Sequence, residues 1–264
     1  MLRYFTGSRA FRIASKDAAT LQAVLDPATF AGIVFSDDAA NYAHFTQAQK
    51  CWAHLLRKAI KLTLQEPNNL TYRAFTDQLL AIYRQACRVQ RDQRLGGAGR
   101  ARKVAALEDE LLALCGPLWF AELPPQEGPA EDYRLLVHEL MRLALARQLF
   151  TFVTAPPVEQ PNGGCQAIDG TNNEAERTLR NVAQARQTGR TNKTSNGARR
   201  QTILTSVLES LRLYLATFTL ASVLAEIGRW SEAGRSCFAE LLEKLNLTSA
   251  EQPVLDRVLP HPSG

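Results

Sequence analysis

The sequence predicts a mainly helical α/β protein, and two observations lead to this fold class. The first is a strand–helix–strand order within residues 1–50, which is typical of a mixed sheet covered by helices. The second is the long middle of the chain, residues 51–152, where apolar residues recur with the 3.6-residue period of amphipathic helices before a loop over 155–164. With 264 residues, the chain is long enough to bury a substantial core.

The two N-terminal strands are predicted from short β-rich runs at residues 2–5 and 32–35. Between them, Ser15 can cap a helix that contains Leu21 on its apolar face. The second strand stops just before Asp37. Functional groups gather at the carboxyl ends of strands in open α/β sheets, so Asp37 is a candidate site residue.

Four helices are predicted in the middle of the chain from their apolar spacing. Their ranges are 51–64, 72–89, 104–114 and 133–152. Glycines 96, 97 and 99 predict a loop between the second and third of these helices, and the Pro-rich run 123–129 predicts an interruption before the fourth.

The C-terminal part is also predicted to be helical. A helix is expected to begin at Thr171, because Thr171 and Glu174 have capping-box spacing. A polar connection over 189–197 then leads into a long amphipathic helix whose apolar residues face the core. The 13 uncharged residues 213–225 are fewer than the about 20 that a membrane span needs, so they predict a buried helix.

The basic charge of the chain is local. The formal net charge is +5, and residues 177–200 hold seven basic residues and no acid, so the rest of the chain carries −2. One interpretation of this basic segment is a phosphate-binding surface, which requires concentrated positive charge. The alternative is a loop and helix face that are simply exposed to solvent. The basic residues are Arg177, Arg180, Arg186, Arg190, Lys193, Arg199 and Arg200. The five scattered cysteines contain no CxxC pair, which favours a reduced cytoplasmic protein.

Two acids are candidates for metal binding. Asp37 can bind a hard cation through oxygen, although Asp37 or Asp38 could instead cap a short helix. Glu176 lies in the first turns of a helix, whose positive end favours a carboxylate and a nearby phosphate. The alternative for Glu176 is an i,i+4 ion pair with Arg180, worth a few tenths of a kcal/mol if exposed.

The pair Cys51 and His54 has the C-x-x-H spacing that can begin a zinc site. A second ligand pair with matching spacing is missing from the sequence. The alternative is a buried Cys51 and Trp52, with His54 at the start of a helix.

Three segments occur in an order that resembles a known family. They are DDAANY at 37–42, CWAHLLRK at 51–58 and NNEAERTLR at 172–180. Together they resemble the insertion sequence 66 family of bacterial transposases, members of the DDE superfamily with an RNase H-like core. The resemblance covers residues 3–227, nearly the whole chain.

The resemblance implies roles for several of these residues. Asp37 and Glu176 match the second and third acids of the catalytic triad, which would bind two Mg²⁺ ions. Cys51 and His54 match a feature near the active site in related families, and Asn173 belongs to the same motif as Glu176. The implied fold is a partial RNase H-like core whose first strands are missing, with a large all-α insertion.

The implied domains are four. Residues 1–50 would form the N-terminal part of the core, 51–165 the helical insertion, 166–229 the C-terminal helices that carry Glu176, and 230–264 a helical tail. The family's first catalytic Asp lies on a strand that should precede residue 2. The chain is therefore expected to be an N-terminally truncated and catalytically impaired form.

The activity implied by the resemblance is metal-dependent cleavage of transposon ends, followed by strand transfer into target DNA. The expected partners are DNA and either further copies of this chain or a full-length transposase, in a bacterial cytoplasm at the nucleoid and not at a membrane. Two alternatives stay open: a non-catalytic DNA-binding or regulatory fragment, and a helical interaction domain without a nucleic-acid role.

Overall fold

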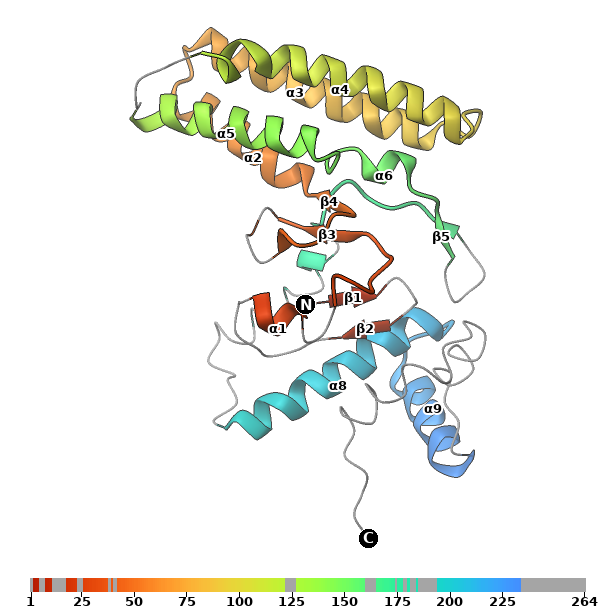
Figure 1. Ribbon diagram of the computed structural model, residues 1–264. Coiled ribbons are helices and arrows are strands. Elements are labelled where there is room, and N and C mark those ends of the chain that lie inside the picture. The colour runs from red at the N-terminus through yellow and green to blue at the C-terminus, as the bar shows by residue number, and fades with distance from the viewer. Residues whose placement is uncertain are drawn as a thin grey trace. The chain divides into compact units, whose positions relative to one another are not determined.

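The computed structural model describes most of the chain, and the described residues are mainly helical, as predicted (Figure 1). They are residues 2–4, 8–10, 18–22, 26–37, 39, 42–121, 127–159, 165–173, 175–177, 180, 184 and 194–233. The chain divides into two compact units. Unit 1 comprises Met1–Ile13, Val158–Gln166 and Ala185–Gly264, and unit 2 comprises Ala14–Pro157 and Ala167–Gln184.

Four helices of unit 2 form an antiparallel bundle (Figure 1). They are α2 (Trp52–Gln65), α3 (Leu70–Arg91), α4 (Gly97–Trp119) and α5 (Gly128–Leu145). Each helix packs on the next in sequence, and α5 packs back on α2. The bundle core is apolar, and each helix contributes a fully buried leucine: Leu55, Leu79, Leu107 and Leu140. The predicted apolar periodicity therefore corresponds to a real buried face.

The loop predicted at the glycines is shorter than expected, because α4 already begins at Gly97 and includes Gly99. A glycine destabilises a helix by only about 1 kcal/mol relative to alanine, and the burial of apolar residues on α4, such as Val104, Leu107 and Leu111, outweighs this cost. α4 also runs through Pro117 to Trp119, beyond the predicted end at residue 114. At the start of α5, Pro129 occupies the first turn, a position that suits proline.

The helix predicted over 133–152 is broken, because α5 ends at Leu145. Just beyond this end, Arg147 has a left-handed backbone with φ of 54°. The N–H of Gln148 then donates to the carbonyl oxygen of Leu143 at 3.0 Å. This is the Schellman ending of a helix, which usually has glycine at the left-handed position. The arginine in that position concealed the helix end from the sequence.

A pair of short parallel strands adjoins the bundle in unit 2. They are β3 (Val34–Ser36) and β4 (Ala48–Lys50). β3 confirms the predicted second strand, whereas β4 was missed because the sequence Ala-Gln-Lys is not β-rich, although all three residues are buried. Unit 2 also contains the short helices α1 (Ala18–Gln22) and α6 (Thr151–Thr154).

The buried side chain of Gln49 joins β4 to α6. Its Nε2 donates to the carbonyl oxygen of Leu149 at 2.9 Å, and its Oε1 accepts from the backbone N–H of Phe152 at 2.9 Å. The second bond satisfies an N–H in the first turn of α6 that has no partner within the helix. Gln49 thus caps α6 from a neighbouring strand.

The described residues of unit 1 form two antiparallel strand pairs and two helices. The strands are β1 (Leu2–Tyr4), β2 (Ser8–Ala10), β5 (Val158–Glu159) and β6 (Cys165–Gln166), and the helices are α8 (Ser195–Tyr214) and α9 (Leu220–Ala233). β1 pairs with β2 and β5 with β6, and α8 packs against β2. The first predicted strand is confirmed by β1, whereas β2, β5 and β6 were missed.

Two predictions for the C-terminal helices are wrong. The 13-residue uncharged segment is not one buried helix, since α8 ends at Tyr214, α9 begins at Leu220, and Leu220 and Leu224 are exposed. Leu204 on α8, which was expected to face the core, is also exposed. The predicted tail from residue 234 onward lies outside the described residues.

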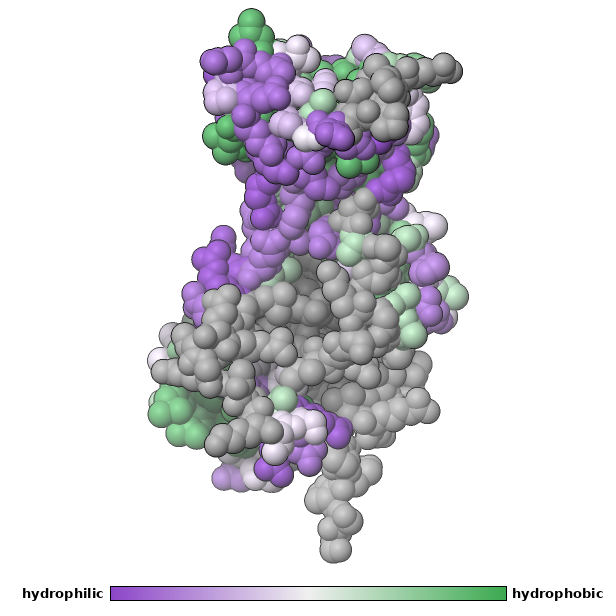
Figure 2. Space-filling view, turned by 90° about the vertical axis from the view of Figure 1, so that its left-hand side faces the viewer, coloured by the Kyte–Doolittle hydropathy of each residue, from purple (hydrophilic) through white to green (hydrophobic). Residues whose placement is uncertain are grey.

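The described strands form three separate two-stranded sheets. An RNase H-like core therefore stays a prediction, as do the four implied domains. Within the described ranges, every helix is too short or too polar to cross a lipid bilayer. On the side shown in Figure 2, the surface over the bundle is mostly hydrophilic, with hydrophobic residues in small separate areas.

Candidate active site

The candidate site lies where β3 and β4 end. Because the two strands are parallel, their carboxyl ends lie at the same edge. Asp37 directly follows β3, and Cys51 directly follows β4. The backbone N–H of Cys51 donates to the carbonyl oxygen of Ser36 at 3.0 Å, which fixes the two strand ends to each other.

Two further side chains surround the end of β3. Lys50 is only 4% exposed, and its Nζ donates to Ser36 Oγ at 3.1 Å and to the carbonyl oxygen of Asp37 at 3.5 Å. Burial raises the pKa of Tyr42, and the negative charge of Asp37 raises it further. Sequence reasoning missed Lys50, because lysine is usually an exposed surface residue.

The segment that leads to Glu176 is anchored on the bundle. The backbone N–H of Trp52 donates to the carbonyl oxygen of Gly170 at 3.1 Å. Gln90, in the last turn of α3, donates through Nε2 to the carbonyl oxygens of Phe152, at 2.8 Å, and of Ile168. A Cβ at position 170 would lie 3.1 Å from the Phe152 ring, so the close approach of this segment favours glycine there.

Cys51 also binds this segment through its side chain. Its thiol donates to Asn172 Oδ1 at 2.9 Å, and the backbone N–H of Asn172 donates to Cys51 Sγ at 3.3 Å. The carbonyl oxygen of Asn172 accepts the backbone N–H of Glu176 at 3.0 Å, so Asn172 lies at the start of the helical turn that carries Glu176. The predicted capping partner Glu174 lies outside the described side chains, while the Thr171 N–H is bound by Asp169 at 3.0 Å.

The carboxylate of Glu176 faces two basic side chains of α2. Its Oε1 lies 3.4 Å from His54 Nε2 and 3.7 Å from Arg57 Nη2. Within the described part of the chain, these are its ion-pair partners, and the alternative i,i+4 pair with Arg180 is not formed. The Glu176 side chain is 42% exposed, so each contact contributes at most about 1 kcal/mol to stability and leaves the carboxylate open to solvent.

The structure therefore connects most of the residues that sequence reasoning placed near a site. Cys51, His54 and Glu176 belong to one continuous set of contacts within unit 2, and Asp37 joins it through its backbone carbonyl oxygen, which accepts from Lys50. Asn173 is exposed at the start of its helix, and the neighbouring Asn172 makes the contact with Cys51. The catalytic roles of Asp37 and Glu176 stay predictions.

The predicted DNA-binding residues fall into three groups. Arg177 and Arg180 are exposed in unit 2, beyond Glu176. Arg199 and Arg200 are exposed in the first turns of α8 in unit 1, whose N-cap is Thr194. The remaining three, Arg186, Arg190 and Lys193, lie outside the described residues.

The candidate metal ligands are of the type that Mg²⁺ prefers, but they are few. Carboxylate oxygens such as those of Asp37 and Glu176 are the ligands that Mg²⁺ prefers. Among the described residues, no three His, Cys, Asp or Glu side chains cluster closely enough to hold a metal ion. The zinc alternative for Cys51 and His54 gains no support from the same residues, since Cys51 Sγ is bound to Asn172 and His54 to Glu176.

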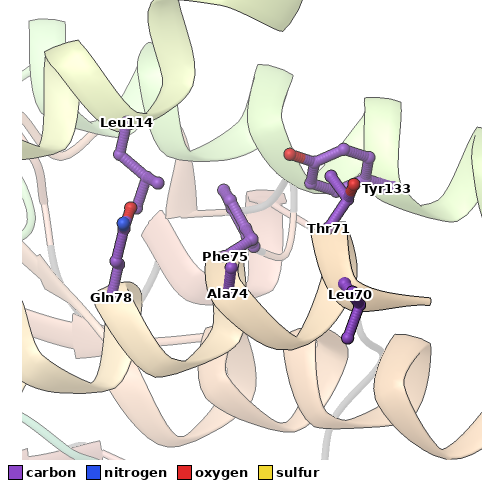
Figure 3. Close-up of a pocket in the computed structure, with 7 residues that line it drawn as sticks. All are labelled: Leu70, Thr71, Ala74, Phe75, Gln78, Leu114 and Tyr133. Carbon is purple, nitrogen blue, oxygen red and sulfur yellow. The ribbon is translucent and has the colours of Figure 1, made fainter. Parts of the chain in front are cut away.

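A separate open pocket of about 400 Å³ lies between α3, α4 and α5 (Figure 3). Its walls are largely apolar and include Phe75, Leu114 and Tyr133. It contains none of the predicted site residues, so it is not part of the candidate active site.

Comparison with known protein families identifies the class of protein as a transposase. Residues 7–200 match the transposase IS66 family, and this range is more than half of the chain. The chain therefore belongs to the transposase IS66 family, and the resemblance carried by the three motifs is confirmed. A search of curated proteins and a search of solved structures each returned no match.

Proposed function

We propose that this chain serves DNA transposition of the DDE type, by metal-dependent cleavage of transposon ends and strand transfer into target DNA. Family membership supports the general activity. The observation that carries the specific site is the contact series through Cys51, which links the strand end before Asp37 to the helical turn of Glu176. Two acids more than 130 positions apart in sequence are thereby tied to one strand edge.

In this proposal, Asp37 and Glu176 would hold Mg²⁺. When bound, the ion would polarise a DNA phosphate and lower the pKa of a water nucleophile. The protein's own contribution is orientation: Ser36 and Lys50 fix the backbone at Asp37, and His54 and Arg57 orient the carboxylate of Glu176.

The exposed arginines give the chain a way to hold DNA. Arg177 and Arg180 follow Glu176 closely in sequence, so a DNA phosphate bound by them would lie near the acid. Arg199 and Arg200, with the three basic residues outside the described part, would add sequence-independent contacts. We further propose that the chain acts at bacterial DNA in the cytoplasm, as a homo-oligomer or a mixed oligomer with a full-length transposase.

The small donor set makes catalytic impairment part of the proposal. Two carboxylates hold a pair of dications less firmly than three, and the described residues provide no group of three ligands. We expect this chain alone to bind metal weakly and to cleave DNA slowly. The second candidate function, a non-catalytic DNA-binding or regulatory fragment, is favoured by the same observation.

Metal binding tests the site directly. Mn²⁺, a paramagnetic substitute for Mg²⁺, is titrated into the 264-residue chain and the free ion is measured by electron paramagnetic resonance. Asp37→Asn and Glu176→Gln are each expected to lower the affinity roughly tenfold, because each removes a charged oxygen ligand. Glu110→Gln, at an exposed acid on α4, is the matched control and should leave the affinity unchanged. Equal affinity in all four proteins would refute the site.

A DNA assay separates the two candidate functions. Supercoiled plasmid is incubated with the chain and Mn²⁺, and nicking is compared between the unsubstituted chain and Glu176→Gln. Slow nicking that disappears in the variant supports an impaired transposase. Salt-dependent DNA binding without nicking supports the regulatory fragment, since phosphate contacts make affinity fall steeply with salt. Absence of DNA binding at low salt would contradict both.

A further inference from the structure

We propose that Cys51 is a positioning residue that sets where Glu176 lies relative to Asp37. The inference rests on the proposed function, because it assigns Cys51 a role in the geometry of the two acids. Its basis is that Cys51 is bonded to both acid-bearing segments at once, through its backbone to one and through its thiol to the other.

The backbone contact fixes Cys51 to the Asp37 side of the site. Its N–H donates to the carbonyl oxygen of Ser36, the residue that immediately precedes Asp37. This bond continues the parallel pairing of β3 and β4 by one residue. Any residue except proline can make it, so this contact does not explain why a cysteine occupies the position.

The thiol contact is specific to a side chain that both donates and accepts. Cys51 Sγ donates to Asn172 Oδ1 and accepts from the Asn172 backbone N–H, so two bonds hold one asparagine. Cys51 is 2% exposed, which excludes competing water and strengthens both bonds. An alanine at position 51 could make neither of them.

The Asn172 backbone passes this constraint to Glu176. Its carbonyl oxygen accepts the Glu176 N–H, so a rotation or shift at Asn172 moves the first turn of the helix and the carboxylate with it. On the other side, His54 lies one turn after Cys51 on α2 and contacts the Glu176 carboxylate at 3.4 Å. The first turn of α2 therefore contacts the segment at its start and at the acid itself.

A purely space-filling role is the competing explanation, because free cysteine often behaves as a small buried apolar residue. The two explanations predict different effects of shortening Cys51 to alanine. A space-filling cysteine would lower global stability when shortened to alanine. A positioning cysteine would in addition loosen residues 170–177 selectively, and its effect would depend on Asn172.

Hydrogen–deuterium exchange on the full chain tests this directly, with Cys51→Ala, Cys51→Ser, Asn172→Ala and the double variant Cys51→Ala/Asn172→Ala. We expect Cys51→Ala to speed exchange of residues 170–177 roughly tenfold, through loss of two hydrogen bonds. Cys51→Ser keeps a donor and an acceptor and should recover much of the protection. The double variant should exchange no faster than Cys51→Ala, because Cys51→Ala already removes the one bond, to Asn172 Oδ1, that Asn172→Ala removes.

Cys115→Ala is the matched control. Cys115 is fully buried in the bundle, and burial raises the pKa of its thiol to about 12, so it is a cysteine with a packing role. This variant should lose global stability while residues 170–177 keep their exchange rate. Unchanged exchange of 170–177 in Cys51→Ala, or additive effects in the double variant, would overturn the positioning role.

Mn²⁺ affinity separates this inference from the proposed function. If the unsubstituted chain binds Mn²⁺ through Asp37 and Glu176, Cys51→Ala should weaken binding severalfold with both acids present, and Cys51→Ser should restore it. Equal affinity in Cys51→Ala would overturn the inference and leave the proposed function standing. If the unsubstituted chain shows no acid-dependent binding, the proposed function fails, and the exchange experiment still decides whether Cys51 positions the segment.

Discussion

The four-helix bundle and the β3–β4 edge lie in the same compact unit but are stabilised in different ways. The bundle is stabilised by many apolar side chains, each buried among others of similar kind. The edge is stabilised by single directional contacts from a few residues, such as Gln49, Cys51 and Trp52. The bundle should therefore tolerate conservative apolar exchange, whereas the edge depends on particular atoms.

The largest effect is expected from a cavity in the bundle. Leu79→Ala removes a fully buried side chain from α3 and should lower the free energy of unfolding by about 2–5 kcal/mol. Urea denaturation measures it. Leu135→Ala, at a leucine of α5 that is 52% exposed, is the control and should change stability by less than about 0.5 kcal/mol. Equal effects would mean that the bundle core is not where the structure places it.

An intermediate effect is expected at the strand edge. Gln49→Leu conserves volume but leaves the Phe152 N–H without its acceptor, at a cost of about 1–3 kcal/mol. The carbonyl of Leu149 keeps a donor, since Trp52 Nε1 lies 2.7 Å from it. Thermal unfolding compares this variant with Gln65→Leu, at an exposed glutamine of α2, which should be nearly neutral. If Gln49→Leu left stability unchanged, the strand edge would not depend on particular hydrogen bonds, and the proposed difference between the two regions would be refuted.

The smallest effect has the opposite sign and concerns the junction between the regions. Arg147→Gly removes the steric strain of a left-handed arginine, which costs about 1–2 kcal/mol. Against this, the greater backbone entropy of glycine in the unfolded chain lowers stability by about 0.5–1 kcal/mol. A net gain of about 0.5–1 kcal/mol is expected in urea denaturation. Lys103→Gly, within α4, should instead destabilise by about 1 kcal/mol. A loss of stability in Arg147→Gly would contradict the helix ending described above.

The same contrast explains which parts of the fold could be predicted. The bundle helices follow from apolar spacing, a local property that is repeated over many residues. The end of α5 was missed because Arg147 gives no glycine signal, and β4 because its three residues are buried without being β-rich. Short elements are specified by their tertiary neighbours, so the local sequence contains too little information to find them.

For the candidate site, the sequence motifs predicted which residues lie near it but did not predict which residues contact each other. Asp37 and Glu176 were predicted from position and resemblance, and Cys51 and His54 were predicted to lie near them. The pairing of Cys51 with Asn172 joins positions 121 apart, and no local pattern encodes such a contact. The alternative interpretation paired Glu176 with Arg180 on its own helix, whereas in the structure His54 and Arg57 of α2 contact the Glu176 carboxylate.

The length of α3 has a consequence for how the four-helix bundle can vary among related chains. α3 has 22 residues and α2 has 14, so α3 is about 12 Å longer. The surplus extends over α6, and its last turn carries Gln90, whose amide holds the carbonyls of Phe152 and Ile168 (Figure 1). A relative with two turns fewer in this helix would have to supply another donor for both carbonyls. Insertions and deletions should therefore be tolerated at the α2–α3 turn more readily than near Gln90.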